Sequence, residues 1–271
     1  MSTAQGADGI AKTKVIAVAN QKGGVGKTTT AVNLSALLGA MGQRVLMIDL
    51  DPQGNTTSGL GMEVDDKSIY EVIMGRMKLT DVMEETEFKN LSIAGSDVRL
   101  ANAELELVEV EKREYRLKTA VQSVQQDFDF IFIDCPPSLG LLTINALGAA
   151  DSVLIPIQCE YYALEGVASL MNTISRVKKT INPHLEIEGV LLTMLDGRTN
   201  LGLQVVDEVK KHFKKQVYAT VIPRSVRLGE APSHGEPIHV YDKRSAGCVA
   251  YVNLAKEVLK RNNIKVKEFK L

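Results

Sequence analysis

A glycine-rich segment near the start of the chain contains the residue types that bind phosphate groups. It reads Asn20-Gln21-Lys22-Gly23-Gly24-Val25-Gly26-Lys27-Thr28-Thr29 and lies between an apolar run and a helical pattern. Glycines let backbone N–H groups turn inward, and the N-terminus of the following helix adds a positive dipole end. We expect Lys27 to reach the β and γ phosphates of ATP, and the Thr28 hydroxyl to ligate Mg²⁺. The residues expected to contact the nucleotide are Lys22, Gly23, Gly24, Val25, Gly26, Lys27, Thr28 and Thr29.

The loop departs from the common form GxxxxGK[ST], because Gln21 occupies the first glycine position and a second lysine, Lys22, follows it. A second cation there is poorly placed to bind the γ phosphate of its own nucleotide. We expect Lys22 to reach across a dimer interface to the partner's ATP, like an arginine finger, a contact worth roughly 10³ to 10⁵ in rate. ATP binding and dimerisation would then be linked. The alternative is a solvent-exposed loop lysine.

Two aspartates follow the apolar run Arg44–Ile48, at Asp49 and Asp51. Alternate residues of a strand share a face, so both side chains are expected to point toward the phosphate edge. Asp51 is the candidate for positioning the attacking water. Asp49 is a candidate for an indirect contact to Mg²⁺ or for a contact to Thr28. Either residue could instead cap a turn before Pro52.

A further aspartate, Asp134, ends the apolar run Phe130–Ile133. Four apolar residues before one aspartate are weak evidence alone, but after a phosphate loop they indicate a Walker-B strand. Asp134 is therefore expected to hold Mg²⁺, through water. Together with Lys22, Lys27 and Asp51 as catalytic candidates, the predicted chemistry is hydrolysis of ATP to ADP and phosphate.

Short apolar runs alternate with segments of helical period along the chain, which is the pattern of a parallel sheet covered by helices on both faces. We expect a single α/β domain over residues 15–271, a mostly parallel twisted sheet of the P-loop NTPase fold, after a flexible leader over residues 1–14. Ligands in such sheets bind beyond the carboxyl ends of the strands. The expected strands are Val15–Ala19, Arg44–Ile48, Phe130–Ile133, Ser152–Ile157, Gly189–Met194 and Val217–Ile222. The expected helices are Thr29–Ala40, Ala101–Val124, Ala163–Lys179, Leu203–Phe213 and Ala246–Lys260.

The formal net charge of −1 conceals an asymmetry: residues 197–271 contain 15 Lys or Arg and 7 Asp or Glu. Such an imbalance suggests a surface for polyanions, although charge runs are often merely solvated. Three well-separated cysteines, with no CxxC pair, argue against a disulfide framework and against zinc or iron–sulfur sites. The sequence also has no run of about 18 apolar residues. We therefore expect a cytoplasmic protein that does not span a membrane.

In order, the segments Lys22–Thr29, Asp49-Leu50-Asp51-Pro52-Gln53-Gly54-Asn55 and Asp134-Cys135-Pro136-Pro137-Ser138 closely resemble the ParA/MinD superfamily of deviant Walker-A ATPases. Three later stretches, 158–166, 193–200 and 222–227, look like the chromosomal ParA (Soj) branch. The resemblance covers nearly the whole chain after Lys14. It implies an ATP-sandwich homodimer that binds double-stranded DNA without sequence preference and drives chromosome or plasmid partitioning on the nucleoid. It also implies a weak ATPase that a ParB-type centromere-binding partner stimulates.

By the same resemblance, Pro223 and Arg224 lie beside the adenine, and Arg198 and Arg227 match a DNA-contacting surface. Physically, the cations of the late segment have few interleaved aromatics, which suits contacts to backbone phosphates better than base stacking. These cations are Arg198, Lys210, Lys211, Lys214, Lys215, Arg224, Arg227, Lys243 and Arg244. Some of the lysines could simply solvate helices.

Two other classes are weighed against this interpretation. A MinD-like membrane ATPase in division-site placement would need an amphipathic tail, but residues 256–271 lack a clean apolar stripe and Asn262-Asn263 interrupts the register. No stable membrane association is therefore expected. The second alternative is a metabolic enzyme on the same scaffold, such as a small-molecule ATP-dependent ligase or an iron–sulfur reductase, but the cysteines lack the arrangement of a bridging cluster. Cys135 is expected instead to pack under the loop.

Overall fold

The computed structural model describes residues 12–160, 165–265 and 269. Residues 1–11 of the predicted leader, which covers residues 1–14, lie outside the described residues. The first strand begins at Lys14, the last residue of that predicted leader. Tyr161–Leu164, which belong to one of the stretches that resemble the chromosomal ParA branch, also lie outside the described residues.

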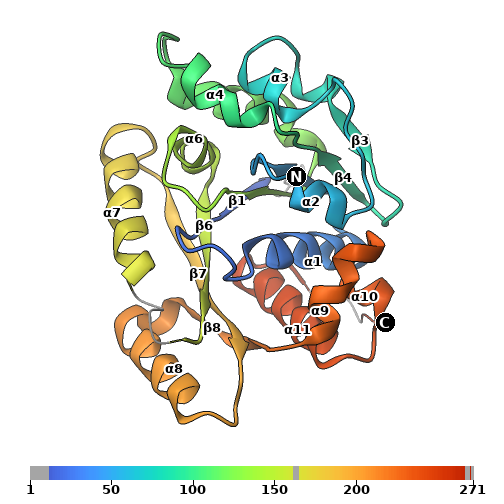
Figure 1. Ribbon diagram of the computed structural model, residues 1–271, viewed down its shortest axis with the longest axis vertical. Coiled ribbons are helices and arrows are strands. Elements are labelled where there is room, and N and C mark those ends of the chain that lie inside the picture. The colour runs from blue at the N-terminus through green and yellow to red at the C-terminus, as the bar shows by residue number, and fades with distance from the viewer. Residues whose placement is uncertain (1–11, 161–164, 266–268, 270–271) are drawn as a thin grey trace, which may run out of the picture.

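One eight-stranded sheet forms the centre of the molecule, in the order β3-β4-β2-β5-β1-β6-β7-β8 (Figure 1). All neighbouring strands run parallel except the edge pair β3 and β4. The predicted α/β class with a mostly parallel sheet is therefore confirmed. The strands are β1 Lys14–Val18, β2 Val45–Asp49, β3 Met83–Glu85, β4 Leu91–Ala94, β5 Phe130–Asp134, β6 Ser152–Gln158, β7 Glu186–Leu195 and β8 Val217–Pro223.

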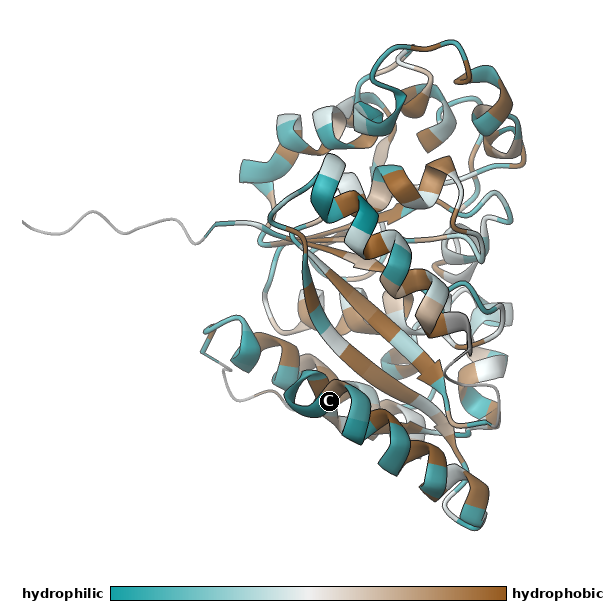
Figure 2. Cartoon of the chain, turned by 90° about the vertical axis from the view of Figure 1, so that its left-hand side faces the viewer, coloured by the Kyte–Doolittle hydropathy of each residue, from teal (hydrophilic) through white to brown (hydrophobic). Residues whose placement is uncertain are grey.

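Helices cover both faces of the sheet, as the continuous apolar runs predicted. On one face α1 and α11 pack against alternate strand residues such as Ile16 and Phe132, and on the other α5, α6 and α7 pack against residues such as Val15 and Ile133. Figure 2 shows the hydrophobic strands between helices with hydrophilic outer sides. The helices are α1 Lys27–Ala40, α2 Asn55–Gly59, α3 Ile69–Ile73, α4 Leu100–Glu106, α5 Arg116–Val124, α6 Leu141–Ala149, α7 Glu165–Thr180, α8 Asn200–Phe213, α9 Val226–Glu230, α10 Ile238–Tyr241 and α11 Ala246–Arg261. Short 3₁₀ helices are η1 Leu79–Asp81, η2 Arg113–Tyr115, η3 Gln125–Asp127, η4 Lys214–Gln216 and η5 Ala231–His234.

The expected single helix over Ala101–Val124 is wrong, because it is two helices, α4 and α5, joined by a turn and η2. Lys112 in the connection has φ of 55°, a left-handed backbone that cannot continue an α-helix. Strands β3 and β4 were not predicted, since three and four residues are too few to show a period, and the helices α2, α3, α6, α9 and α10 were not predicted either. The remaining boundaries differ from expectation by a few residues at most, apart from the longer β7.

Candidate nucleotide site and its neighbouring surface

The phosphate loop connects the end of β1 to α1 at the carboxyl edge of the sheet. Gly24 and Gly26 have φ of 71° and 86°, in the region that glycine adopts without steric cost. Asn20 fixes the start of the loop: its amide donates to the carbonyl of Pro156 at 2.7 Å, and its side-chain oxygen accepts from the N–H of Lys22 at 3.0 Å. The loop is therefore held open at the edge of the sheet, with α1 directly behind it.

The side chain of Lys27 is buried and folds back over the loop, where its Nζ donates to the carbonyl of Lys22 at 3.2 Å. Burial lowers the pKa of Lys27, and the negative charge of Asp134 counteracts that shift. Among the described residues this ammonium makes a single hydrogen bond, so donors remain for an anionic ligand.

Asp134 ends β5 beside the loop and brings two threonine hydroxyls together. Its Oδ2 accepts from Thr28 at 2.7 Å and from Thr56 of α2 at 2.8 Å. Its Oδ1 is fully buried and has no hydrogen-bond partner among the described residues. Mg²⁺ in nucleotide sites is usually held by one or two carboxylates, waters and the phosphates themselves. A buried carboxylate oxygen without a partner, beside a loop hydroxyl, fits such an ion.

Asp49 and Asp51 have different surroundings, although both are buried. Asp49 Oδ2 accepts from the N–H and the hydroxyl of Thr57 at 2.9 and 2.7 Å, and its Oδ1 accepts from the N–H of Asp51 at 3.2 Å. The structure thus brings Asp49 to the start of α2 and not to Thr28. Asp51 accepts only from the N–H of Gln53, at 3.0 Å, which leaves one carboxylate oxygen without a bond among the described residues.

The two strand-end carboxylates, Asp49 and Asp134, are partners in the register of β2 and β5. Burial, reinforced by the charge of Asp49, raises the pKa of Asp134 to about 7. Burial also raises the pKa of Asp49 to about 6, against the hydrogen bonds from Thr57. Two acids buried side by side destabilise each other's ionised forms, and a bound cation would relieve this.

Glu160 lies between two cations that the sequence assigned to different roles. Lys22 Nζ is 3.9 Å from its Oε2, and Arg224 donates to its Oε1 at 3.1 Å. All three side chains are partly or largely exposed. The loop lysine is therefore not free in solvent but paired with an acid that follows β6.

A cavity of about 200 Å³ lies next to the phosphate loop, between β7 and the segment after β8. Gly26 and Thr29 form its loop side, and Pro223 and Arg224 its far side. Met194, with φ of 53°, also lines it, as does Tyr251. The structure thus brings the two residues that the resemblance assigned to adenine against the phosphate loop.

Arg198 and Arg227 lie on different segments at the carboxyl edge, after β7 and after β8. Arg198 pairs with Asp196 at 2.7 Å and has a side chain 88% exposed. Arg227 pairs with Glu230 at 2.8 Å and with Asp242 at 3.4 Å. Both guanidiniums thus have acidic partners that a phosphate would have to replace.

Several residues that build the site were not predicted. Thr56 and Thr57 hold the two strand-end carboxylates, Glu160 pairs with Lys22, and Met194 and Tyr251 line the cavity. The only available signal was the pair of threonines directly after Gly54-Asn55, where a short helix begins.

A phosphate loop after β1, with carboxylates at the ends of β2 and β5, defines the class of the protein: it is a P-loop nucleoside triphosphatase. A family model described as an AAA domain matches residues 13–187. The chain is 59% identical to the sporulation initiation inhibitor protein Soj of Bacillus subtilis, over 90% of this chain and 98% of that one. It is 51% identical to the chromosome partitioning protein ParA of Myxococcus xanthus, over 93% and 90% of the two chains.

Among solved structures, one described as cobyrinic acid a,c-diamide synthase from Mycobacterium smegmatis, with bound ADP and magnesium, superposes with a TM-score of 0.81. That structure is 39% identical in sequence, and the superposition covers 92% of this chain and 94% of the other. The chain belongs to the ParA/Soj family of chromosome-partitioning ATPases, as the sequence motifs predicted.

Proposed function

We propose that the chain is a DNA-binding partitioning ATPase whose ATP-bound form is a homodimer and whose weak hydrolysis is stimulated by DNA and by a ParB-type partner. The observation that carries the proposal is a second loop lysine, Lys22, beside residues that fit Mg²⁺ and phosphate. Lys22 pairs with the partly exposed Glu160, and a second nucleotide would replace that ion pair.

The residues of each copy divide the chemistry among them. Lys27 and the loop N–H groups bind the β and γ phosphates, Thr28 and Asp134 hold Mg²⁺, and Asp51 orients the attacking water with its unbonded oxygen. Mg²⁺ would neutralise charge on the phosphates. Pro223 and Arg224 flank the base. Asp49 does not contact the nucleotide but positions residues that do, because it anchors the backbone of Asp51 and the start of α2.

The exposed apolar side chains support a second copy at this edge. Among the described residues, several large exposed hydrophobics follow the carboxyl ends of β4, β7 and β8 within a few residues. Exposed apolar side chains of this kind can be covered by a second copy. These residues are Val98, Leu201, Leu203 and Val226.

Non-specific DNA binding is supported by the location of Arg198 and Arg227 at the same edge. Closure of two copies would place two sets of these arginines in one assembly and double the number of phosphates neutralised. With about six phosphates neutralised, the slope of log K against log salt would be near −5. To bind a phosphate, each arginine gives up an ion pair with an exposed acid, and such exposed pairs contribute little.

The packing of the tail and the state of the cysteines weaken the rival functions. In the tail, α11 ends at Arg261, and both Ile264 and Phe269 pack against the α1 and α11 core instead of forming an apolar face for lipid. No helix within the described ranges has the length and apolarity to cross a bilayer. Against a ligase that uses a thiol, burial raises the pKa of Cys135 far above its usual value, and that of Cys159 to about 11.

Light scattering on the full chain tests the proposal. With ADP and Mg²⁺ the chain is expected to be monomeric, and with a non-hydrolysable ATP analogue and Mg²⁺ dimeric. Addition of a 60-base-pair duplex of arbitrary sequence should give a larger complex only in the second case. A chain that stays monomeric when saturated with the analogue would refute the role of Lys22, and equal DNA binding in both nucleotide states would refute the coupling.

A further inference from the structure

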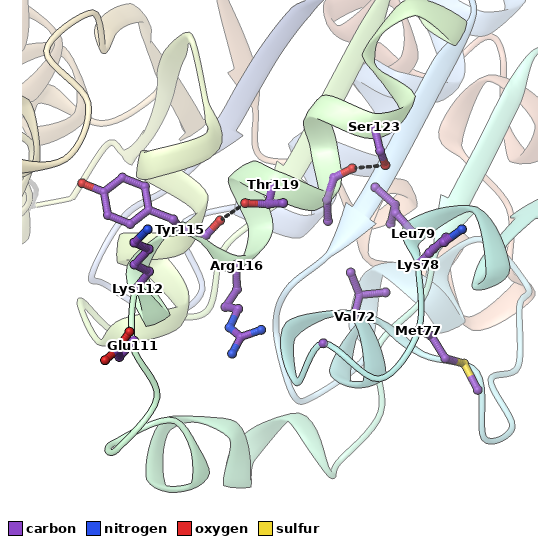
Figure 3. A pocket seen from close by; sticks show the side chains of 12 residues that line it. Val72, Met77, Lys78, Leu79, Glu111, Lys112, Tyr115, Arg116, Thr119 and Ser123 are labelled. Carbon is purple, nitrogen blue, oxygen red and sulfur yellow. Dashed lines mark hydrogen bonds between the residues drawn. The ribbon is translucent and has the colours of Figure 1, made fainter.

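A groove of about 580 Å³ lies away from the nucleotide site, between the α3–η1 segment and one face of α5 (Figure 3). Its inner wall is apolar: Val72 and Leu79 are buried core residues, and Met77 and Ala120 pack against the same core. None of the residues assigned above to nucleotide, Mg²⁺ or DNA lines it.

The α5 wall consists of small side chains at helical spacing. Thr119, Ala120 and Ser123 succeed Arg116 at i+3, i+4 and i+7, which places all four on one side of the helix. The two hydroxyls donate to backbone carbonyls of their own helix, Thr119 to Tyr115 at 3.1 Å and Ser123 to Ala120 at 2.7 Å. This wall therefore has contact area to offer and little unsatisfied hydrogen-bonding capacity.

Three cations surround the groove, and within the described part of the chain none of them has an acid within salt-bridge distance. They are Lys78, Lys112 and Arg116, and Glu111 is the one acid that lines the groove. Figure 3 shows Lys112 and Lys78 at opposite ends, with Arg116 between them. By contrast, the neighbouring Arg113 pairs with Glu114 at 3.4 Å.

Arg116 is the least satisfied of the three. Its guanidinium lies against the backbone of Gly75, where an added β-carbon would be 2.7 Å from one nitrogen. It is half-buried, yet its side chain makes no hydrogen bond or ion pair to any described residue. A guanidinium has five donors, and leaving them unpaired when water is partly excluded is costly.

We propose that this groove is a docking site for a protein partner that contributes an extended segment with alternating acidic and apolar side chains. The three cations around the groove would attract acidic side chains, and the apolar inner wall would accept apolar ones. From Tyr115 to Ser123 the groove follows α5 for about 12 Å, at about 1.5 Å per residue. About four extended residues span that length. In an extended chain alternate side chains face opposite ways, so one set reaches the floor while the other meets the separated cations.

The test uses a fluorescein-labelled octapeptide, Glu-Leu-Asp-Phe repeated twice, in a fluorescence anisotropy titration of the full chain at low salt. Two peptides serve as controls: one with lysine at every acidic position, and one with serine at every apolar position. The alternating acidic peptide should bind, and both controls should bind at least tenfold more weakly.

Matched charge reversals on α5 and on the segment that precedes it locate the site. Arg116→Glu should weaken binding of the peptide at least tenfold, and Lys112→Glu, at an exposed position, at least threefold. Lys118→Glu on the same helix, which does not line the groove, should stay within twofold of the parent. Thermal melting checks that each variant is folded. If Arg116→Glu does not fold, Lys112→Glu still tests the proposal.

Four outcomes would overturn the proposal. They are no binding of the alternating peptide up to 1 mM, equal loss in Arg116→Glu and Lys118→Glu, equal binding of the serine control, or displacement by inorganic phosphate well beyond that by sodium chloride of equal ionic strength. The last would mean a site for small anions. ATP-dependent dimerisation of Arg116→Glu should match the parent, so this test and that of the proposed function fail independently.

Discussion

The strand-end carboxylates and the surface arginines satisfy their charges in opposite ways. Asp49 and Asp134 are buried and bonded to threonines: Asp49 to Thr57 of α2, and Asp134 to Thr28 of α1 and Thr56 of α2. Arg198 and Arg227 are exposed; Arg198 pairs with Asp196, and Arg227 pairs with Glu230 and Asp242. The first arrangement fixes geometry, because a buried charge tolerates little displacement. The second is readily exchanged, because exposed ion pairs contribute little to stability. Hydrolysis should therefore depend on single atoms, and DNA binding on summed charge.

The largest effect is expected from Asp51→Ala. Removal of the carboxylate that orients water should lower the ATPase rate by about 10² to 10⁴. ATP-dependent dimerisation and DNA binding should persist, since the phosphate contacts remain. Phosphate release under saturating ATP and partner measures the rate, and light scattering measures the dimer.

Lys27→Ala is the matched control for that experiment, because it should prevent the nucleotide-bound state and thereby both dimerisation and DNA binding. An Asp51→Ala variant that hydrolyses ATP like the parent would remove the water-positioning role and leave the rest of the site intact.

The buried pair also predicts a pH dependence of stability in the chain without nucleotide and metal. The folded pKa of Asp134 is about 7, above its usual value of 3.8. As the pH rises, Asp134 ionises in the unfolded chain before it ionises in the folded chain. Its contribution to the free energy of unfolding is therefore largest below about pH 4 and declines as the pH rises toward 7. The loss is at most about 4 kcal/mol, since one unit of pKa corresponds to about 1.36 kcal/mol.

Urea unfolding in EDTA at pH 5 and pH 8 measures the larger part of that loss, with Asp134→Asn as the comparison. The variant cannot ionise at this position, so its stability relative to the parent should rise by about 2 to 3 kcal/mol between pH 5 and pH 8. Equal pH dependence in both proteins would mean that Asp134 is not the group responsible.

Arg227→Glu tests the other side of the comparison. DNA affinity at moderate salt should fall by a factor of about 10 to 100, because one phosphate contact per copy is lost and a repulsion is added. The slope against log salt should become shallower. Dimerisation with the ATP analogue should remain, and full DNA affinity in the variant would exclude this surface.

The sequence allowed the central strands and the phosphate loop to be predicted, because strands buried on both faces appear as continuous apolar runs and the glycine loop is local. It did not reveal that Asp49 and Asp51 diverge. Alternation along β2 suggested a shared face, but Asp51 lies beyond the strand end, and Asp49 is bound by Thr57 from a five-residue helix too short to show a period. The Lys22–Glu160–Arg224 cluster was equally hidden, since it joins three segments that only the sheet brings together.

The smallest effect concerns that cluster, which combines features of both regions: it lies at the site but is built from exposed ion pairs. If Lys22 acts in trans, its attraction to Glu160 must be broken when two copies close. Glu160→Gln should then tighten ATP-dependent dimerisation by up to about fivefold, as expected for the loss of an exposed pair worth up to about 1 kcal/mol.

Sedimentation of the parent and variant over a concentration series with the ATP analogue measures the change. Glu87→Gln is the control, since Glu87 is exposed and forms no ion pair with any described residue. Weaker dimerisation of Glu160→Gln would mean that Glu160 contributes to the closed dimer itself and does not restrain Lys22 in the monomer.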